Sequence, residues 1–163
     1  MSSPDLPNSE GAVFREARDG DLPAILALLG DDPLGKYREL ALPHDADIPA
    51  AYKTAFEAIA ADPRNQLYVA EIDGAVVGCF QLTFIPGLTY QGGERATIEG
   101  VRVSQSMRGR GIGKAMIQYA IARARARGCV LVQLSIDKRR AEAQEFYHAL
   151  GFVASHEGMK LKL

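Results

Sequence analysis

One stretch of the sequence, residues 101–116, constrains the fold of this chain more than any other. Its alternating apolar residues predict a strand that ends at Val103, and a long helical pattern begins near Ile112. Between them lies a short basic turn with three alternate glycines: Gly109, Gly111 and Gly113. Glycine leaves main-chain N–H groups accessible, and a helix start adds unpaired N–H groups and the positive end of its dipole. The stretch therefore predicts a site for a pyrophosphate or a similar dianion.

The glycine spacing decides between known phosphate-binding loops. A P-loop requires G-x-x-x-x-G-K-[ST], but Ala115 follows Lys114, and Arg108 stands where the first glycine should be. A dinucleotide-binding loop requires G-x-G-x-x-G and an acidic residue about 20 residues further on. The chain has G-x-G-x-G, and its next acid, Asp137, lies roughly at that place. The dinucleotide alternative is therefore weakened but stays open.

The pattern that fits is [QR]-x-x-G-x-[GA], filled by Arg108, Gly111 and Gly113. It resembles the pyrophosphate loop of the GNAT superfamily of acyl-CoA-dependent N-acetyltransferases. Residues 97–103, TIEGVRV, resemble the fourth strand of that family, and residues 143–152, AQEFYHALGF, resemble its closing helix and turn. The loop and the F-Y-x-x-x-G-F element, in this order and separation, make the resemblance specific. It covers residues 96–153, about a third of the chain.

The pattern along the chain predicts the element order β-α-α-β-β-β-α-β-α-β-β. We therefore expect an α/β fold with a mixed, mostly antiparallel central sheet flanked by helices. The resemblance implies that this sheet is split between its fourth and fifth strands. We expect residues 1–10 to be a flexible tail and residues 11–163 to form a single acyl-CoA N-acyltransferase domain, closed by a hairpin of residues 152–154 and 159–163.

Composition excludes several other classes of function. The 163 residues carry 19 basic and 20 acidic side chains, a formal net charge of -1, so no overall charge argues for nucleic acid. No apolar run reaches the length of a membrane span. Cys79 and Cys129 lie in apolar, strand-like surroundings, which indicates reduced core residues of a cytoplasmic protein. The three histidines are too scattered for a metal site.

The resemblance implies acetyl-CoA as co-substrate. The cofactor arm would lie along the fourth strand like an added strand, beside Val101, Arg102 and Val103. The N–H of Val103 would hold the thioester oxygen. The loop would contact the pyrophosphate through seven residues: Arg108, Gly109, Arg110, Gly111, Ile112, Gly113 and Lys114. Arg140 stands where the family often has asparagine; it can donate to the cofactor but cannot accept.

An alkylammonium has a pKa of about 10, so an amine acceptor must lose a proton before it attacks. We expect Glu99 to be the base, directly or through a water, with Glu94, Glu71 and His44 as alternatives. The resemblance implies that Tyr147 protonates the departing thiolate. We therefore expect direct acetyl transfer to a primary amine in a ternary complex.

The sequence does not name the acceptor, which can be a small-molecule or a peptide amine. Four residues make the expected acceptor entrance mixed and somewhat acidic, which favours a cationic amine: Tyr37, His44, Asp45 and Asp47. A second hypothesis is a non-catalytic acyl-CoA-binding sensor or regulatory module on the same fold. Because proteins of this family often dimerise, the resemblance also allows a homodimer.

Overall fold

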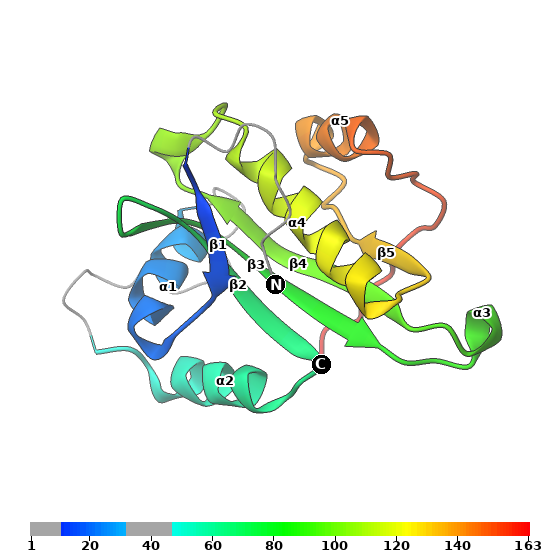
Figure 1. The fold of residues 1–163 in the computed structure, drawn as a ribbon, viewed down its shortest axis with the longest axis horizontal. Coiled ribbons are helices and arrows are strands. Elements are labelled where there is room, and N and C mark those ends of the chain that lie inside the picture. Colours follow the sequence, from blue (N-terminus) through cyan, green and yellow to red (C-terminus); the bar gives the residue numbers. More distant parts are fainter. Residues whose placement is uncertain (1–10, 32–46) are drawn as a thin grey trace. The chain divides into compact units, whose positions relative to one another are not determined.

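A computed structural model describes residues 11–31 and 47–163 of the chain. The expected N-terminal tail lies outside these residues. The chain divides into two compact units, Met1–Gln133 and Leu134–Leu163. The first contains most of the sheet and the helices α1 to α4, and the second contains α5 (Figure 1). Among the described residues, no helix has the length and apolar character needed to cross a membrane.

The sheet has five strands in the order β1-β2-β3-β4-β5. They are β1 (Val13–Glu16), β2 (Asn65–Ile72), β3 (Ala75–Ile85), β4 (Arg95–Val103) and β5 (Leu131–Leu134). Neighbours from β1 to β4 pair antiparallel, and β5 runs parallel to β4. The helix α4 (Ile112–Arg127) makes the crossover that a parallel pair requires. The expected mixed, mostly antiparallel α/β fold is confirmed.

The turn between β2 and β3 forms at Asp73-Gly74, a residue pair typical of two-residue hairpins. Asp73 and Gly74 have φ angles of +50° and +78°, the left-handed values of a two-residue hairpin turn. The pairing that follows sets which side chains share a face. In β2 and β3, Val69 lies opposite Cys79, and Tyr68 lies opposite Phe80. Because faces alternate along a strand, these two pairs point to opposite sides of the sheet.

The first face of the sheet is covered by α1 (Leu22–Gly30) and α2 (Ala50–Ala61). Ile25 and Leu28 of α1 pack against Val69 and Cys79 in one buried cluster. Phe56 of α2 joins a second cluster, with Leu22 and Leu26. Apolar residues at helical spacing on α1 therefore bury against one face of the sheet.

The opposite face is covered by α4 (Figure 1). The helix buries six side chains at helical spacing: Ile112, Ala115, Met116, Ile117, Ala120 and Ala124. A close approach occurs at Gly78 of β3, where a Cβ atom would lie 2.8 Å from the Met116 Sδ. Glycine is thus required where the first turns of α4 meet the sheet. The helix ends at Gly128, whose φ of +84° is the left-handed conformation that glycine commonly adopts at a helix C-terminus.

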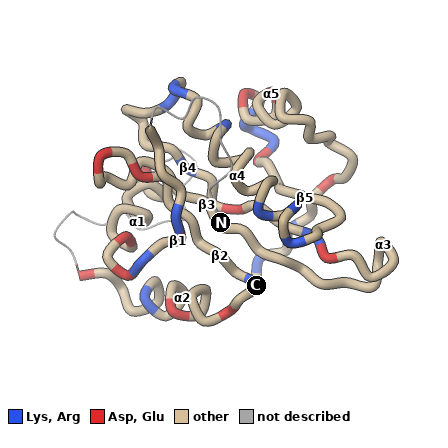
Figure 2. Tube along the Cα trace, viewed as in Figure 1, with Lys and Arg blue, Asp and Glu red and all other residues tan. Residues whose placement is uncertain are grey.

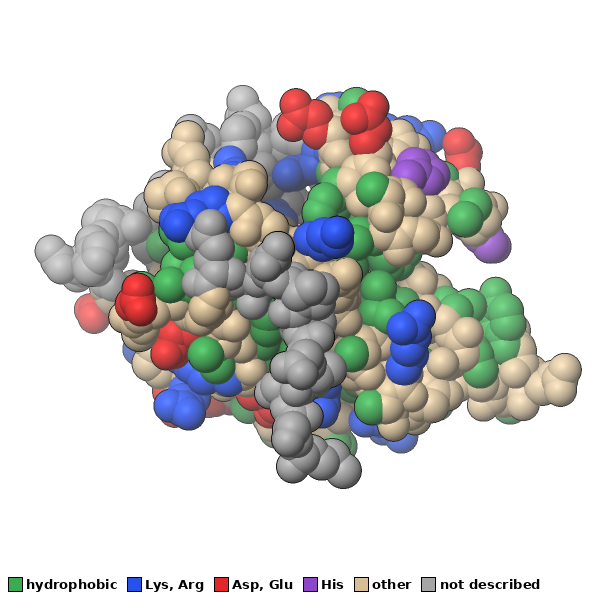
Figure 3. All heavy atoms as spheres, turned by 45° about the horizontal axis from the view of Figure 1, so that its top comes forward, with side chains coloured by type: hydrophobic (Ala, Val, Ile, Leu, Met, Phe, Trp, Pro, Cys, Tyr) green, Lys and Arg blue, Asp and Glu red, His purple; other side chains and the backbone are tan. Residues whose placement is uncertain are grey.

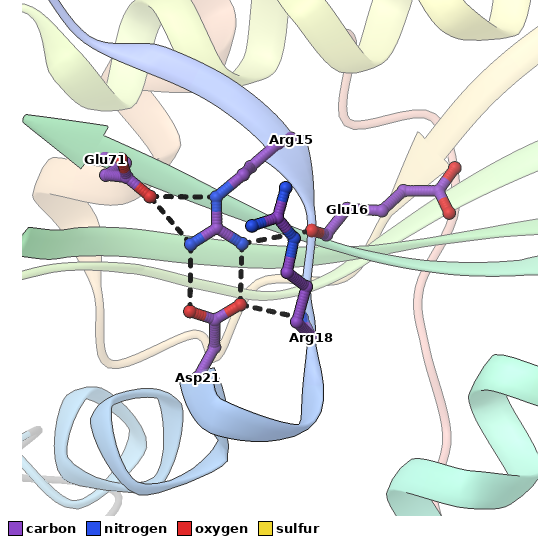
Figure 4. A network of polar contacts seen from close by, with 5 residues as sticks. All are labelled: Arg15, Glu16, Arg18, Asp21 and Glu71. Carbon is purple, nitrogen blue, oxygen red and sulfur yellow. Dashed lines mark hydrogen bonds and ion pairs between the residues drawn. The ribbon is translucent and has the colours of Figure 1, made fainter. Parts of the chain in front are cut away.

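An ion-pair network holds the N-terminal edge strand to its neighbours (Figure 4). The guanidinium of Arg15 contacts the carboxylates of Asp21 and Glu71, each at 2.7 Å. Asp21 also accepts a hydrogen bond from the main-chain N–H of Arg18 at 2.7 Å. The hydrogen bonds from Arg15 hold the pKa of Asp21 below its usual value. This network therefore ties β1, β2 and the start of α1 together.

The expected closing hairpin is wrong. Residues 152–163 contain no strand, and Met159, Leu161 and Leu163 are exposed. Their alternation is typical of a strand, but a strand forms only with a partner, and the described residues provide none for this segment. Two helices complete the fold: the single turn α3 (Thr89–Gly92), and α5 (Ala141–Ala149), which overlaps the segment 143–152 that resembles the closing helix and turn of the family.

Candidate functional site

The second half of β4 leaves the regular ladder at a β-bulge. Gln81 of β3 pairs with Glu99, but Cys79 pairs with Arg102. Two residues of β4, Gly100 and Val101, therefore stand opposite the single residue Phe80. Gly100 has a φ of +61°, a left-handed conformation that favours glycine.

The bulge sets the direction of the main-chain groups that follow it. Ser104 donates its N–H to the carbonyl of Val77 at 2.8 Å, and Val103 is paired with Gly78. In an antiparallel ladder this pattern makes Val103 a non-hydrogen-bonded position, so its own N–H and C=O point away from β3. β5 adjoins the first part of β4, because Val130 donates its N–H to the Glu94 carbonyl and Gln133 bonds Thr97. β5 ends at Leu134, so Val103 lies beyond its span.

The glycine-rich loop presents a helix start without a side-chain cap. Gly109 and Gly111 have φ angles of +77° and +81°, and Gly111 is the N-cap of α4. The first main-chain bond of the helix runs from Ala115 to the Gly111 carbonyl. The preceding N–H groups, those of residues 112–114, therefore have no acceptor within the helix, and glycine has no side chain to supply one. This geometry suits a phosphate.

The basic side chains of the loop have different surroundings. Arg108 donates from Nε to the Val103 carbonyl at 3.2 Å, and its Nη2 lies 3.9 Å from the Asp31 carboxylate. Arg110 contacts the Met107 Sδ, and Lys114 is exposed. Figure 2 shows basic residues at both ends of α4. The loop therefore adds positive charge to its main-chain N–H groups, and Arg108 joins it to the end of β4.

Glu99 lies on the sheet face that α1 and α2 partly cover, because it pairs with Gln81 and Gln81 shares a face with the buried Cys79. Its side chain is exposed. Carboxylates that were alternative bases are engaged elsewhere. Arg127 contacts Glu94 at 2.6 Å and holds its pKa below the usual value, and Arg15 contacts Glu71. The remaining alternative, His44, lies outside the described residues.

A row of uncharged polar side chains crosses the same face, and sequence reasoning missed it. Asn65 of β2 accepts hydrogen bonds from Gln81 at 3.1 Å and from Thr83 at 2.7 Å. Gln133 of β5 donates to Thr97 of β4 at 3.1 Å. The signal in the sequence is that polar residues recur at every second position of otherwise apolar strands. Glu99 is flanked by Gln81 across the ladder and by Thr97 along its strand.

A model of the acetyltransferase (GNAT) family matches residues 24–152 of the chain. The chain belongs to the GNAT family. The match includes the bulged β4, the uncapped loop and α4, and it extends into the second compact unit. Membership of this family and the names of the relatives support acyltransferase activity.

Two curated relatives carry names of acetyltransferases. Glucosamine 6-phosphate N-acetyltransferase of Trypanosoma brucei brucei is 33% identical over 99 residues, which are 61% of this chain and 65% of the relative, slightly less than two thirds of its length. L-methionine sulfoximine/L-methionine sulfone acetyltransferase of Pseudomonas paraeruginosa is 30% identical over 146 residues, 88% of this chain and 81% of the relative.

A solved structure is more similar in sequence. It is described as a transcriptional regulator from Bacillus halodurans, and it is 47% identical to this chain. It superposes with a TM-score of 0.89 and covers 93% of this chain and 99% of the other. The two chains therefore share one fold over nearly their whole lengths.

The remaining GNAT motif residues lie in the second unit. Tyr147 is half-buried on α5, with its ring centroid 5.0 Å from that of Phe146 and 5.7 Å from that of Phe152. Arg140 is the N-cap of α5, and its N–H bonds the Asp137 carbonyl at 2.8 Å. The F-Y-x-x-x-G-F motif thus builds a small aromatic cluster around Tyr147.

The expected acceptor entrance of the GNAT domain is described only in part. Tyr37, His44 and Asp45 lie outside the described residues. Apolar side chains gather where α3 lies (Figure 3), and Leu88 and Tyr90 of this segment are 98% and 57% exposed. Within the described ranges, no group of three or more histidine, cysteine, aspartate or glutamate side chains could hold a metal ion.

Proposed function

We propose that the protein transfers an acetyl group from acetyl-CoA to a primary amine by direct attack in a ternary complex. The observation that carries this proposal is the orientation of Val103, whose N–H faces away from β3 beside the uncapped loop. One edge of β4 thus offers main-chain groups to an extended ligand, and the loop next to it offers N–H groups to a pyrophosphate. These residues fit acetyl-CoA, the acetyl donor of the family.

Acetyl-CoA supplies an acetyl group activated as a thioester. The N–H groups of residues 109–114 would bind the pyrophosphate, whereas that of Arg108 donates to the Gln105 carbonyl at 3.4 Å. The N–H groups of Val101 and Val103 would bind the arm. The Val103 N–H would also donate to the thioester oxygen as negative charge develops on it. Loss of one such donor typically costs about 2.7–4 kcal/mol of activation free energy. Arg102 donates from Nη1 to the Val101 carbonyl at 2.8 Å and would brace this segment.

Glu99 would take the proton from the acceptor ammonium, because an amine attacks only in its neutral form. Its exposed position on β4, one residue before the bulge, makes it accessible to an acceptor. As the new C–N bond forms and the C–S bond breaks, Tyr147 would give its proton to the departing thiolate. Arg140 would donate to the cofactor from the start of the same helix. These roles follow from the motif positions of the two residues.

The names of the two curated relatives support a primary amine as acceptor. Glucosamine 6-phosphate and L-methionine sulfone both carry one, together with a phosphate or a carboxylate. We therefore propose a small polar amine as the acceptor of this protein as well.

The experiment that tests the proposal measures free thiol released from acetyl-CoA in the presence of a panel of amines. We expect release with at least one small polar amine. Glu99→Gln should lower the rate, change the pH-rate profile and keep acetyl-CoA binding. Gly111→Val should lose binding, because valine at a φ of +81° is strained and covers the loop N–H groups. An unchanged pH-rate profile in the Glu99 variant would remove this residue as the base.

One observation favours a second candidate, a non-catalytic acyl-CoA sensor: the 47% identical structure is described as a transcriptional regulator. A sensor would bind acetyl-CoA without releasing thiol for any amine in the panel. Thiol release, measured together with acetyl-CoA binding by titration calorimetry, therefore separates the two functions.

A further inference from the structure

We propose that the acceptor amine carries an anionic group, a carboxylate or a phosphate, which Arg95 binds at the far end of the polar row that leads to Glu99. This inference rests on the proposed function and adds a substrate class to it. Arg95 is the first residue of β4, and Glu99 lies four residues further along the strand. Because side chains alternate, Arg95, Thr97 and Glu99 all project from the same face of the sheet.

The environment of Arg95 differs from that of the arginines that pair with carboxylates. Its side chain is half-buried, and its Nε is buried without a hydrogen-bond partner among the described residues. Arg15 and Arg127, by contrast, contact carboxylates at 2.7 and 2.6 Å. A partly buried guanidinium is stabilised by an anion, which its planar array of donors can bind in a bidentate manner. The structure therefore assigns Arg95 to an anion that comes with a ligand.

The side chains between Arg95 and Glu99 match the rest of such a ligand. Gln133 uses its Nε2 to bond Thr97, and Gln81 uses its Nε2 to bond Asn65. The Oε1 atoms of Gln81 and Gln133 have no hydrogen-bond donor among the described residues. They can therefore accept hydrogen bonds from hydroxyl or ammonium groups. At one end of the row, Arg95 can donate hydrogen bonds to an anion. Between Arg95 and Glu99, Gln81 and Gln133 can accept hydrogen bonds from the rest of the ligand.

The spacing limits the size of the acceptor. Four residues of a strand span about 13 Å between Cα atoms. The long side chains of Arg95 and Glu99 shorten the distance that the ligand itself must bridge. An amino sugar phosphate, whose amine and phosphate are separated by the sugar ring, spans more of this distance than an α-amino acid does. A simple alkylamine would leave Arg95 without a partner.

The test compares two pairs of probes that differ only in the anion. Glucosamine 6-phosphate is paired with glucosamine, and L-methionine sulfone is paired with its methyl ester. Binding to the CoA-saturated protein is measured by titration calorimetry, which does not depend on turnover. We expect the anionic member of at least one pair to bind at least tenfold more tightly. The phosphate pair and the carboxylate pair show which anion the site prefers.

Arg95→Gln should abolish this difference within the preferred pair and leave the affinity for CoA unchanged. Arg95→Lys should keep part of it, because lysine retains the charge but not the bidentate geometry. Arg125→Gln, at an exposed arginine on α4, is the matched control and should behave like the wild type.

Equal affinities within both pairs for the wild-type protein would overturn the inference, whatever the variants do. An equal loss for the anionic and the neutral probe in Arg95→Gln would overturn it as well. If the glutamine variant fails to fold, the wild-type pairs and Arg95→Lys still decide. Arg95-dependent binding without thiol release would refute the proposed acetyl transfer and leave the anion site standing.

Discussion

Gly78 is the position where a single added methyl group should test the packing between the sheet and α4. It lies buried in β3, paired with Ala70 on one side and with Val103 on the other. A Cβ atom there would lie 2.8 Å from the Met116 Sδ and 3.0 Å from the main-chain oxygen of Arg102. The sulfur belongs to a side chain that can shift, but the oxygen belongs to β4. Met116 is 0% exposed, so its shift must displace neighbours.

The expected change in stability combines two opposing effects. Overpacking of a filled core typically costs about 1–3 kcal/mol. Replacement of glycine by alanine also restricts the unfolded chain, which stabilises the folded state by about 0.4–1 kcal/mol. The free energy of unfolding should therefore fall by about 1–2 kcal/mol in Gly78→Ala and by about 3 kcal/mol in Gly78→Val, which adds two further carbons. For a chain of this size, 1 kcal/mol lowers Tm by about 2–4 °C. The valine variant should then melt about 6–12 °C below the wild type.

The assay is urea unfolding together with calorimetric melting, and Gly30→Ala is the matched control. A Cβ at Gly30 would meet no atom within 4 Å, and this residue ends α1. The free energy of unfolding of the control should therefore rise by about 0.4–1 kcal/mol, whereas that of the Gly78 variants falls. Because Gly78 pairs with Val103 and lies against the main chain of Arg102, both residues of the candidate site, acetyl-CoA affinity should fall in the Gly78 variants and stay unchanged in the control. A Gly78→Val variant as stable as the wild type would refute the packing argument.

Two further changes test separate parts of the molecule. Tyr147→Phe should lower kcat by about 10²-fold and leave acetyl-CoA affinity unchanged. This is the low end of the range for a general acid, because a thiolate leaves readily. If stopped-flow thiol release and calorimetry show that kcat and acetyl-CoA affinity fall by the same factor, Tyr147 does not act as the acid. Asp21→Asn should lower the urea midpoint at neutral pH. The pKa of Asp21 is depressed in the folded state, so its contribution is present above the usual aspartate pKa of about 4 and is lost as the pH falls through the folded value. The gap between wild type and variant should therefore narrow in acid, and a gap that is constant with pH would contradict the network of Figure 4.

Local patterns predicted the parts of the fold that local interactions decide. The strand that ends at Val103 and the long helix that begins near Ile112 follow from residue type and spacing, and the structure confirms them. The closing hairpin failed for a different reason. The alternation of Met159, Leu161 and Leu163 satisfies the strand pattern, but pairing depends on an edge elsewhere in the chain, which no local pattern contains.

The candidate site divides in the same way. Arg108, Gly111 and Gly113 form a contiguous motif, and the loop that they build could be anticipated. The polar row could not, because Gln81, Thr97 and Gln133 come from three strands and meet only once the register is fixed. Arg95 was missed for a related reason. Its significance is the lack of a carboxylate partner among the described residues, which is a property of its surroundings and not of its sequence position.

The hydrogen bond from Arg108 to the Val103 carbonyl has a practical consequence for protein engineering. Val103 directs its N–H away from β3, and its carbonyl accepts a hydrogen bond from Arg108 of the loop that follows. A graft of the glycine-rich segment alone onto another scaffold would lose this hydrogen bond, and the Val103 N–H would no longer be held in its orientation toward the ligand. A transplant that moves residues 99–116 as one cassette would keep both.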